Sequence, residues 1–316
     1  MTLGSLEVIK PGLLTSVQDL GRYGHQAIGV PVAGPMDVFS HRLANQLVGN
    51  DAAAATLEVT LIGPELLIEA DTTLAIVGAL FETTCDGHAV PMDASFVVHA
   101  GQRLKFGRLV QGARAYLSVA GGILTAGVLG SRATHLVSGM GGLQGRALLP
   151  GDRLPVLAQT VLRPGRKGVG LTLPTGRRAR LRVMPGPQDD WFHPDALTAL
   201  AGVSFRISPR SNRMGYRLEG PPLARLDERE LVSEPVGMGA IQVPAAGAPI
   251  LLMADRQTAG GYPKIGYVIA ADLPLAGQLA PGDFLEFILC SRHEAVAALI
   301  ARERQLLRYA DMKEAS

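Results

Sequence analysis

The segment from Asp255 to Lys264 carries an acid, an amide, a hydroxyl, a Gly-Gly pair, a phenol and a lysine. It directly follows the apolar run 249–253, which is typical of a buried strand. Gly260 and Gly261 can adopt positive φ and let a ligand approach the backbone, and Pro263 stiffens the chain just before the lysine. The pattern predicts a scaffold strand that presents a functional loop. A surface hairpin in which the glycines only turn the chain is an equal alternative.

A second polar group lies at residues 211–217, where Asn212, Arg213 and Tyr216 surround a glycine. Guanidinium, amide and phenol groups arranged in this way can hold a carboxylate or a phosphate through forked hydrogen bonds. A purely structural role is an equal alternative. Further along the chain, Glu234 is a candidate proton acceptor or hydrogen-bond anchor, and Gln242 is expected on the strand that follows it.

Several catalytic signatures are absent from the sequence. It contains no P-loop, no nucleophile elbow, no His-Glu-x-x-His zinc motif and no dinucleotide-binding glycine fingerprint. It also lacks a Met-Lys-Met biotin attachment site, because its one Met-Lys pair, Met312-Lys313, lies in the tail. Cys85 and Cys290 are far apart and predict neither a zinc site nor a disulfide framework. We therefore expect no metal, and any ATP or biotin chemistry would require another chain or a site without a known motif.

The composition restricts the class of protein. With 316 residues, 47% hydrophobic and 18% charged, the chain can bury a large core and is long enough for two domains. The formal net charge of +2 arises from mixed acidic and basic residues, which predicts no nucleic-acid partner. No run approaches the ~20 apolar residues that span a bilayer, and the N-terminus does not resemble a secretory leader. We expect a cytoplasmic protein with no membrane partner.

The 38 glycines and 21 prolines separate short apolar runs, and this pattern predicts a mainly β fold with a few helices. Helices are expected at 36–48, where Asp37 is placed to cap the helix as an acid of its first turn, and at 194–200 and 292–309. Similar Pro-Gly-Asp turns close the two halves, and the Gly-, Pro- and Arg-rich stretch 163–180 is the expected linker. We predict an N-terminal domain at residues 1–174 and a C-terminal domain, with the terminal helix, at residues 175–316.

Five blocks of the sequence, at residues 16–22, 29–37, 211–216, 233–234 and 257–266, together resemble one family. This is the carboxyltransferase A and B subdomain family, also called allophanate hydrolase subunit 2, and the resemblance runs nearly from end to end. It implies two pseudo-symmetric cyclophilin-like β-barrel domains. It also implies a partner of the allophanate hydrolase subunit 1 type. Gln188 stands where a basic residue is expected in some members of the family.

The resemblance implies two chemistries. In urea carboxylase the equivalent region moves a carboxyl group from carboxybiotin to urea. In the prokaryotic 5-oxoprolinase it is one of three subunits that open 5-oxoproline to glutamate with consumption of ATP. Because this sequence carries neither a carboxylase domain nor a biotin carrier, we expect a 5-oxoprolinase complex that uses ATP. Its partners would be the B-type 5-oxoprolinase subunit, which is a KipI-like protein, and a third subunit.

Two alternatives remain open at this point. One is a biotin-dependent carboxyltransferase or allophanate hydrolase-type subunit that acts on urea-like amides. The other is a non-enzymatic, KipA-like regulatory module that uses the same loops to bind a partner protein. A biotin requirement would indicate the first, and partner binding that tolerates changes at Asp255 or Lys264 would indicate the second.

The resemblance and the residue types together define a site hypothesis. The catalytic candidates are Asp255, Glu234 and Lys264. One of the acids would orient the substrate or accept a proton, and Lys264 or Arg213 would hold a carboxylate or a phosphorylated intermediate. The candidates for binding a small amide substrate are Asn212, Arg213, Tyr216, Gln257, Thr258, Gly260, Gly261 and Tyr262. Among the latter, Gln257, Thr258 and the backbone amides of Gly260 and Gly261 would stabilise negative charge on the carbonyl oxygen. We expect the loop at 255–264 to line a groove.

Overall fold

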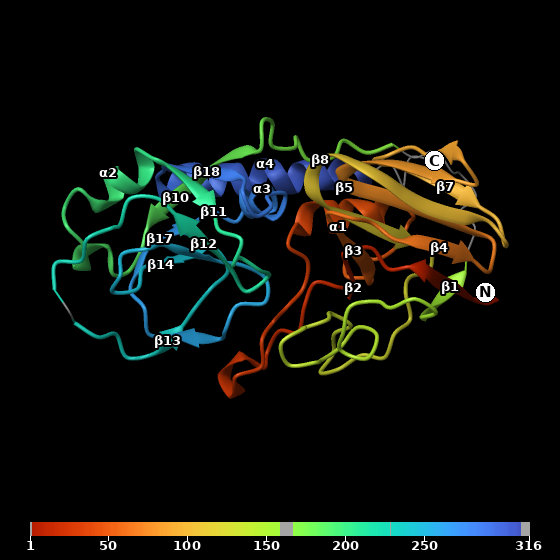
Figure 1. Cartoon of the computed structure of the whole chain (residues 1–316), viewed down its shortest axis with the longest axis horizontal. Coiled ribbons are helices and arrows are strands. Elements are labelled where there is room, and N and C mark those ends of the chain that lie inside the picture. Colours follow the sequence, from red (N-terminus) through yellow and green to blue (C-terminus); the bar gives the residue numbers. More distant parts are fainter. Residues whose placement is uncertain (1, 159–166, 228, 311–316) are drawn as a thin grey trace. The chain divides into compact units, whose positions relative to one another are not determined.

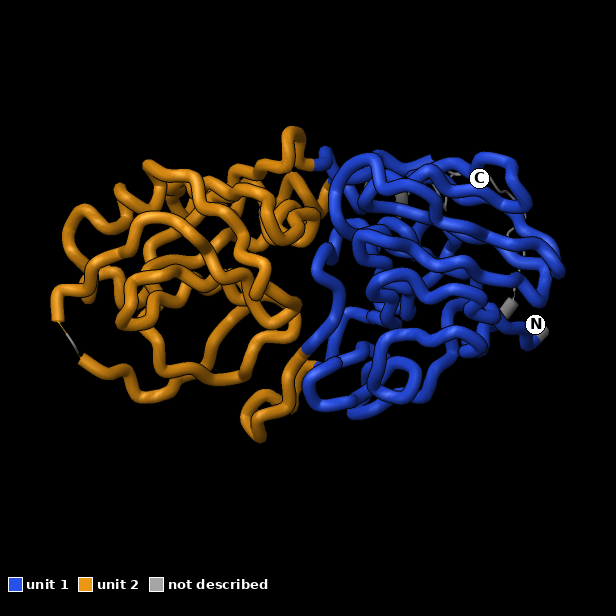
Figure 2. The backbone as a smooth tube through the Cα atoms, viewed as in Figure 1, with its two compact units in different colours: residues 1–22, 33–173, 305–316 blue, residues 23–32, 174–304 orange. Residues whose placement is uncertain are grey.

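A computed structural model of the chain describes residues 2–158, 167–227 and 229–310 (Figure 1). Strands account for 38% of the structure and helices for 15%, which confirms the predicted mainly β fold with few helices. The chain forms two compact units (Figure 2). Unit 1 comprises Met1–Arg22, Ala33–Leu173 and Gln305–Ser316, and unit 2 comprises Tyr23–Val32 and Pro174–Arg304. The expected linker at 163–180 lies partly outside the described residues.

Within the described residues, unit 1 contains a nine-stranded sheet that curls into half a barrel. Its two longest strands, β5 (Thr72–Cys85) and β8 (Arg103–Val119), pair with each other along most of their length. The strand order is β2-β3-β8-β4-β1-β9, and β5 also pairs with β6 and β7. The remaining strands are β1 (Thr2–Lys10), β2 (Leu14–Gln18), β3 (Thr56–Thr60), β4 (Glu65–Ile68), β6 (His88–Ala89), β7 (Ala94–Val98) and β9 (Arg153–Ala158).

Apolar side chains from this sheet form the core of unit 1, because alternate residues of each strand face the same side. Leu57 and Leu117, which pair across β3 and β8, are fully buried there. Helix α1 (Val38–Leu47) packs on β5 and β8. Asp37 caps this helix by accepting a hydrogen bond of 2.9 Å from the backbone N–H of Ser40. The predicted helix is confirmed, and Asp37 lies at its N-cap, whereas the first turn itself carries no acidic residue.

Unit 2 is built on a closed seven-stranded barrel with the order β10-β17-β14-β15-β12-β11-β18. The barrel closes where β10 pairs in parallel with β18, whereas the other pairs are antiparallel. Its strands are β10 (Arg178–Pro185), β11 (Ser204–Ile207), β12 (Gly215–Glu219), β14 (Ala240–Gln242), β15 (Ile250–Leu252), β17 (Lys264–Val268) and β18 (Phe284–Leu289). Leu181, Ile241 and Phe287 are among the side chains that fill the interior.

The remaining elements are short, apart from the last helix. A two-stranded ribbon joins β13 (Glu234–Pro235) to β16 (Ala259–Gly260). The helices are α2 (Ala196–Ala201), α3 (Leu273–Gly277) and α4 (Arg292–Ala310), and the 3-10 turns are Gln26–Ile28 and Asp189–Trp191. Helices α2 and α4 confirm two further sequence predictions. No helix in the described part of the chain combines the length and apolar character needed to cross a membrane.

The backbone of Gly186, at the end of β10, approaches β17 very closely. The backbone N–H of Gly186 donates to the carbonyl oxygen of Ile265 at 2.9 Å, which holds the two strands together here. A Cβ atom on this residue would lie only 2.1 Å from the carbonyl oxygen of Lys264. We therefore expect Gly186→Ala to lower the free energy of unfolding by about 2 kcal/mol, since backbone atoms must shift. Urea unfolding measures this value.

Gly237→Ala is the matched control for that measurement. The nearest atom to its added methyl group would be a ring carbon of Tyr267 at 3.6 Å, which is ordinary van der Waals contact. We expect this variant to change the free energy of unfolding by less than about 0.5 kcal/mol. Equal losses in the two variants would contradict a specific close approach at Gly186.

Candidate functional site

A pocket of about 740 Å³ lies in unit 2, on the face of strands β12, β15 and β14 that is turned away from the barrel interior. Its walls come from the turn at 208–214, the loop at 244–249, and two residues of the predicted functional loop, Gln257 and Tyr262. Its volume falls within the range of roughly 300–1,000 Å³ that is usual for small-molecule sites. The predicted loop therefore contributes to a concave site.

The floor of the pocket follows from strand register. Arg217 of β12 pairs with Ile250 of β15, Ile250 pairs with Gln242 of β14, and Gln242 pairs with Lys264 of β17. Residues that pair directly across neighbouring strands project from the same face of a sheet. Their neighbour Tyr216 is fully buried on the other face. One row across three strands thus joins a guanidinium, an apolar side chain and an amide. Lys264 lies opposite the amide at the end of this row, where the register between β14 and β17 shifts.

The ribbon of β13 and β16 is anchored by an ion pair at the lysine end of this row. Glu234, opposite Gly260 in the ribbon, contacts the Lys264 ammonium and accepts a 2.9 Å hydrogen bond from Nε2 of Gln188. The Lys264 side chain is 1% exposed and that of Glu234 is 37% exposed. Hydrogen bonds from Lys264 and Gln188 hold the pKa of the Glu234 carboxyl below its usual value. The ammonium is therefore buried under a carboxylate that remains ionised at neutral pH.

Gln188 completes this anchor in a way that a basic residue could not. Its Oε1 accepts a 3.1 Å hydrogen bond from the backbone N–H of Lys264, while its Nε2 donates to Glu234. A lysine or arginine has no acceptor and would place a second cation beside the buried ammonium. The departure from the expected basic residue at this position therefore matches the local hydrogen bonding.

Two glutamines form an amide pair at the pocket. Nε2 of Gln257 donates to Oε1 of the buried Gln242 at 3.2 Å, and Nε2 of Gln242 lies 3.5 Å from the backbone oxygen of Tyr262. Gly260 leaves room for this arrangement, because a Cβ atom there would lie 2.6 Å from Nε2 of Gln242. Gln242 thus fixes the orientation of the Gln257 carboxamide.

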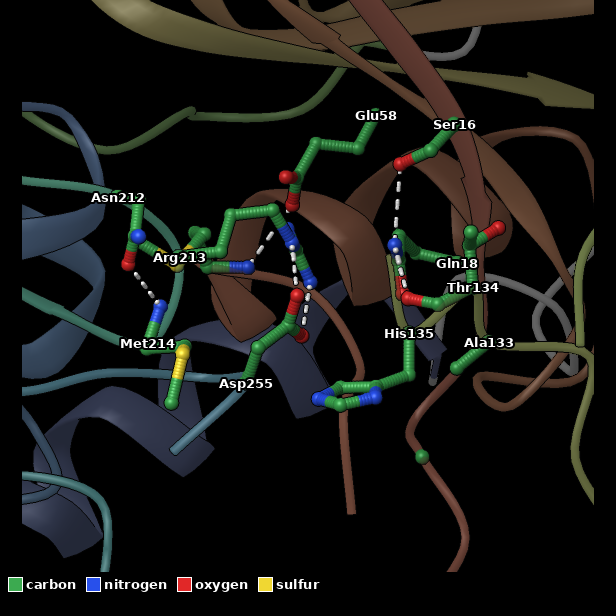
Figure 3. Close-up of polar contacts among 12 residues, drawn as sticks. Ser16, Gln18, Glu58, Ala133, Thr134, His135, Asn212, Arg213, Met214 and Asp255 are labelled. Atoms are coloured by element: carbon green, nitrogen blue, oxygen red, sulfur yellow. Dashed lines mark hydrogen bonds and ion pairs between the residues drawn. The ribbon is translucent and has the colours of Figure 1, made fainter. Parts of the chain in front are cut away.

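Arg213 and Asp255 form a buried ion pair in unit 2 (Figure 3). Nε and a terminal nitrogen of the guanidinium each donate to one carboxylate oxygen at 2.9 Å, and the side chains are only 4% and 2% exposed. The backbone N–H of Asp255 also donates to the carbonyl oxygen of Arg213 at 2.9 Å. This double connection joins the segments that carry Asn212 and Gln257. Because both oxygens of Asp255 are engaged by Arg213, it is suited to support the site rather than to accept a proton.

Tyr216 also has a supporting position. Its buried hydroxyl lies within hydrogen-bond distance of the carbonyl oxygens of Ala276 and Leu279, at 3.2 and 3.1 Å, and so ties β12 to the end of α3. Thr258 contributes its carbonyl oxygen to the ribbon by accepting from the backbone N–H of Val236 at 3.1 Å.

The predicted site residues therefore fall into three groups. Asn212, Gln257 and Tyr262 line the pocket. The ribbon and the chain that leads into and out of it carry Glu234, Thr258, Gly260, Gly261 and Lys264. Arg213, Tyr216 and Asp255 are buried supports. Arg210 and Arg217 also line the pocket, but the sequence did not predict them as site residues. Arg217 alternates with the inward-facing Tyr216 on one strand, and this alternation is a sequence signal that indicates an outward-facing arginine.

In unit 1, the polar residues of the block at 16–22 are buried as well. Nε2 of Gln18 donates to Oγ of Ser16 at 3.0 Å and to the carbonyl oxygen of Thr134 at 3.1 Å (Figure 3). Arg22 donates to the carbonyl oxygen of Ala133. These bonds attach strand β2 to the loop that follows β8, and they give this block a structural function within unit 1.

A second buried network surrounds helix α1. Glu58 accepts hydrogen bonds from the backbone N–H of Met36 at 2.9 Å and from the hydroxyl of Tyr116 at 2.8 Å. His41 lies beside this network, with Nδ1 2.9 Å from Oγ1 of Thr56 and its ring edge-on to Tyr116. Burial lowers the pKa of His41 to about 4. Among the residues that the structure describes, no group of three His, Cys, Asp or Glu side chains could hold a metal ion.

Comparison with known proteins identifies a family and close relatives. Residues 28–289 match the family described as carboxyltransferase domain, subdomain A and B. The chain is 42% identical over 299 residues to the C subunit of 5-oxoprolinase from Escherichia coli K12, and the match covers 95% of this chain and 96% of that protein. It is 35% identical to the C subunit of 5-oxoprolinase from Haemophilus influenzae, with 89% of each chain covered.

A solved structure extends the likeness to a larger enzyme. The crystal structure of the K. lactis urea amidolyase superposes with a TM-score of 0.91 and 31% sequence identity over 96% of this chain. The match covers 20% of the amidolyase, so the chain spans about a fifth of that protein. The residues of this chain therefore have counterparts both in a protein of similar length and within part of a much longer one.

The buried Arg213–Asp255 pair yields a prediction for stability. We expect either Arg213→Met or Asp255→Leu to lower the free energy of unfolding by about 3 kcal/mol, because each breaks a buried ion pair that is held by two hydrogen bonds. The double variant should be clearly more stable than the sum of the single losses implies. Urea unfolding of the four proteins measures the coupling, and strictly additive losses would contradict it.

The burial of His41 yields a prediction for pH dependence. With its pKa lowered from 6.5 to about 4, the unfolded chain binds a proton in this window that the folded chain does not. The contribution is fully present above pH 6.5 and is lost as the pH falls towards 4. Between pH 7.5 and 5, wild type should lose about 2 kcal/mol more stability than His41→Gln. The exposed-site variant His99→Gln is the control, and identical losses in wild type and His41→Gln would refute the assignment.

Proposed function

This chain belongs to the carboxyltransferase domain, subdomain A and B, family, and from that membership we propose that it is the lactam-binding subunit of a 5-oxoprolinase-type complex. The assembled complex opens 5-oxoproline to glutamate with consumption of ATP. Its other members are an allophanate hydrolase subunit 1-like protein and a third subunit. The observation that supports this proposal within the chain is the oriented carboxamide of Gln257 at the wall of a pocket of small-molecule size.

A carboxamide is the natural complement of a lactam. The ring holds the lactam N–H and C=O on the same edge, as one donor beside one acceptor. Gln257 offers the converse pair, an acceptor oxygen beside a donor nitrogen, and Gln242 fixes the direction in which this group points. The side-chain amide of Asn212 lines the same pocket, while its Oδ1 accepts from the backbone N–H of Met214 at 2.9 Å. Two amides are thus placed to hold the substrate amide.

Ring opening breaks the bond between the carbonyl carbon and nitrogen; water supplies hydroxyl to the carbon and a proton to the nitrogen. Donors aimed at the carbonyl oxygen favour this step because negative charge develops there. We assign that function to the side-chain amides of Gln257 and Asn212. Glu234 is a weakened base, because Lys264 and Gln188 already donate to it. We therefore assign Glu234 and Lys264 to positioning the ribbon.

ATP belongs to the proposed reaction of the complex as its second substrate. Among the described residues that line the amide-bearing pocket, there is neither a lysine nor a glycine-rich phosphate cradle. We therefore assign the recognition of the lactam to this chain and the recognition of the nucleotide to its partners. Co-expression with both partners, followed by an assay for ATP-dependent glutamate release from 5-oxoproline, tests the proposal.

Carboxyl transfer to a urea-like amide is the second candidate function, and the likeness to the urea amidolyase structure favours it. Urea also presents N–H and C=O groups side by side and could bind Gln257 in the same way. The two reactions are distinguished by biotin. Avidin in the assay should leave glutamate release unchanged if the complex is a 5-oxoprolinase, whereas bicarbonate- and biotin-dependent activity on urea would replace our first proposal with the second.

The ribbon anchor leads to a prediction for activity. We expect Lys264→Met to reduce glutamate release by the assembled complex roughly 100-fold, because the freed ribbon no longer holds Gln257 in place. Complex assembly, followed by size-exclusion chromatography, should remain intact. Lys10→Met, which removes an exposed ammonium paired with Glu65 in unit 1, serves as the matched control. Unchanged turnover in Lys264→Met would exclude this lysine from the site.

A further inference from the structure

The pocket in unit 2 has an excess of positive charge. Its charged lining residues are Arg210, Arg217 and Glu219. Glu219 already has a cation, because its carboxylate lies 3.6 Å from the guanidinium of Arg206. Within the described ranges, neither Arg210 nor Arg217 has a carboxylate partner or a side-chain hydrogen bond. Two guanidinium groups at one concave site, with no anion assigned to them, favour an anionic ligand.

Local hydrogen bonds place the two arginines on one wall. The turn before β12 folds back on that strand, because Ser208 N–H donates to the carbonyl oxygen of Arg217 at 2.9 Å. A second hydrogen bond joins the same two segments, because Oγ of Ser211 accepts from the backbone N–H of Arg217 at 3.0 Å. The same turn carries Arg210, whose backbone N–H donates to Oγ of Ser208 at 3.4 Å. Both arginine side chains therefore begin from one hydrogen-bonded unit.

The row across the floor separates this cationic wall from the amides. Arg217 and Gln242 both pair with Ile250, from opposite sides. Neighbouring strands are about 4.8 Å apart, so the two backbones lie about 10 Å from each other with an apolar side chain between them. Long side chains can converge across this distance on a small ligand. An apolar ring over Ile250 could thus meet the Gln242–Gln257 amide pair at one edge and a guanidinium at another.

We propose that Arg217, with Arg210 beside it, recognises a carboxylate and makes this pocket select lactams that carry a carboxylate over neutral lactams. A guanidinium suits this task because it can donate two parallel hydrogen bonds to one carboxylate. The inference rests on the proposed function, since it names the substrates that the same pocket admits. It adds a specificity determinant that stands apart from the amide-binding groups.

The test compares two ligands in the assembled complex. 5-Oxoproline carries the carboxylate, and 2-pyrrolidinone is the same ring without it. For Arg217→Gln we expect KM for 5-oxoproline to rise roughly 10- to 100-fold with a smaller change in kcat, since a hydrogen-bonded charge is lost. The inhibition constant of 2-pyrrolidinone should change less than about twofold. Arg217→Lys, which retains the charge but not the fork, should fall between wild type and Arg217→Gln.

Arg180→Gln is the control variant, because Arg180 is exposed on β10 and pairs with Glu286. We expect it to leave both constants unchanged. An unchanged KM for 5-oxoproline in Arg217→Gln would overturn the proposal. So would an equal loss of affinity for both ligands, because that result would indicate general damage to the pocket.

A binding measurement separates this inference from the proposed function. Isothermal titration calorimetry of the complex with 5-oxoproline, without ATP, reports affinity independently of turnover. If wild type turns over 5-oxoproline but Arg217→Gln still prefers 5-oxoproline to 2-pyrrolidinone as strongly as wild type does, the inference is rejected and the proposed function stands. Absence of turnover would reject the proposed function, and calorimetry would then show whether Arg217 still distinguishes 5-oxoproline from 2-pyrrolidinone.

Discussion

The buried ammonium of Lys264 is the constraint on which the candidate site depends. Removing a charge from water is costly, so this side chain, 1% exposed, requires an ionised partner at contact distance. Glu234 meets the requirement and is in turn held by Gln188. The partner comes from the ribbon, so satisfying the charge also fixes the ribbon against the outer face of the barrel. The pocket wall formed by Gln257 and Tyr262 follows from that attachment.

The chemistry of the pocket follows from how the barrel divides its residues. Inward-facing side chains of β12, β14 and β15 supply the apolar interior, and their outward-facing neighbours supply a guanidinium, an aliphatic side chain and an amide in one row. A short buried ion pair, Arg213–Asp255, then joins the two segments that complete the walls. A barrel of this kind can host many reactions, and the reaction proposed here rests on the site and on the relatives rather than on the fold.

The sequence predicted the mainly β fold, helix α1 with its Asp37 cap, and the strand-to-loop change at residues 250–264, because these depend on local patterns. The separate roles of the polar residues depended on tertiary partners. Tyr216 and Asp255 carry groups that suit ligand binding. In the fold, however, the Tyr216 hydroxyl lies within hydrogen-bond distance of a carbonyl oxygen of α3, and the Asp255 carboxylate pairs with Arg213. Ile250 pairs with Arg217 on one side and with Gln242 on the other. The periodicity of a single sequence does not predict the register between such separate strands.

Hydrogen–deuterium exchange of the assembled complex, with and without 5-oxoproline, tests the central claim most directly, because it locates the bound ligand on the chain. The site described here predicts slower exchange in peptides that cover 208–219, 240–252 and 255–264 when the ligand is added, with other parts of unit 2 unchanged. Protection confined to segments outside these three, at saturating ligand and in an active complex, would contradict it.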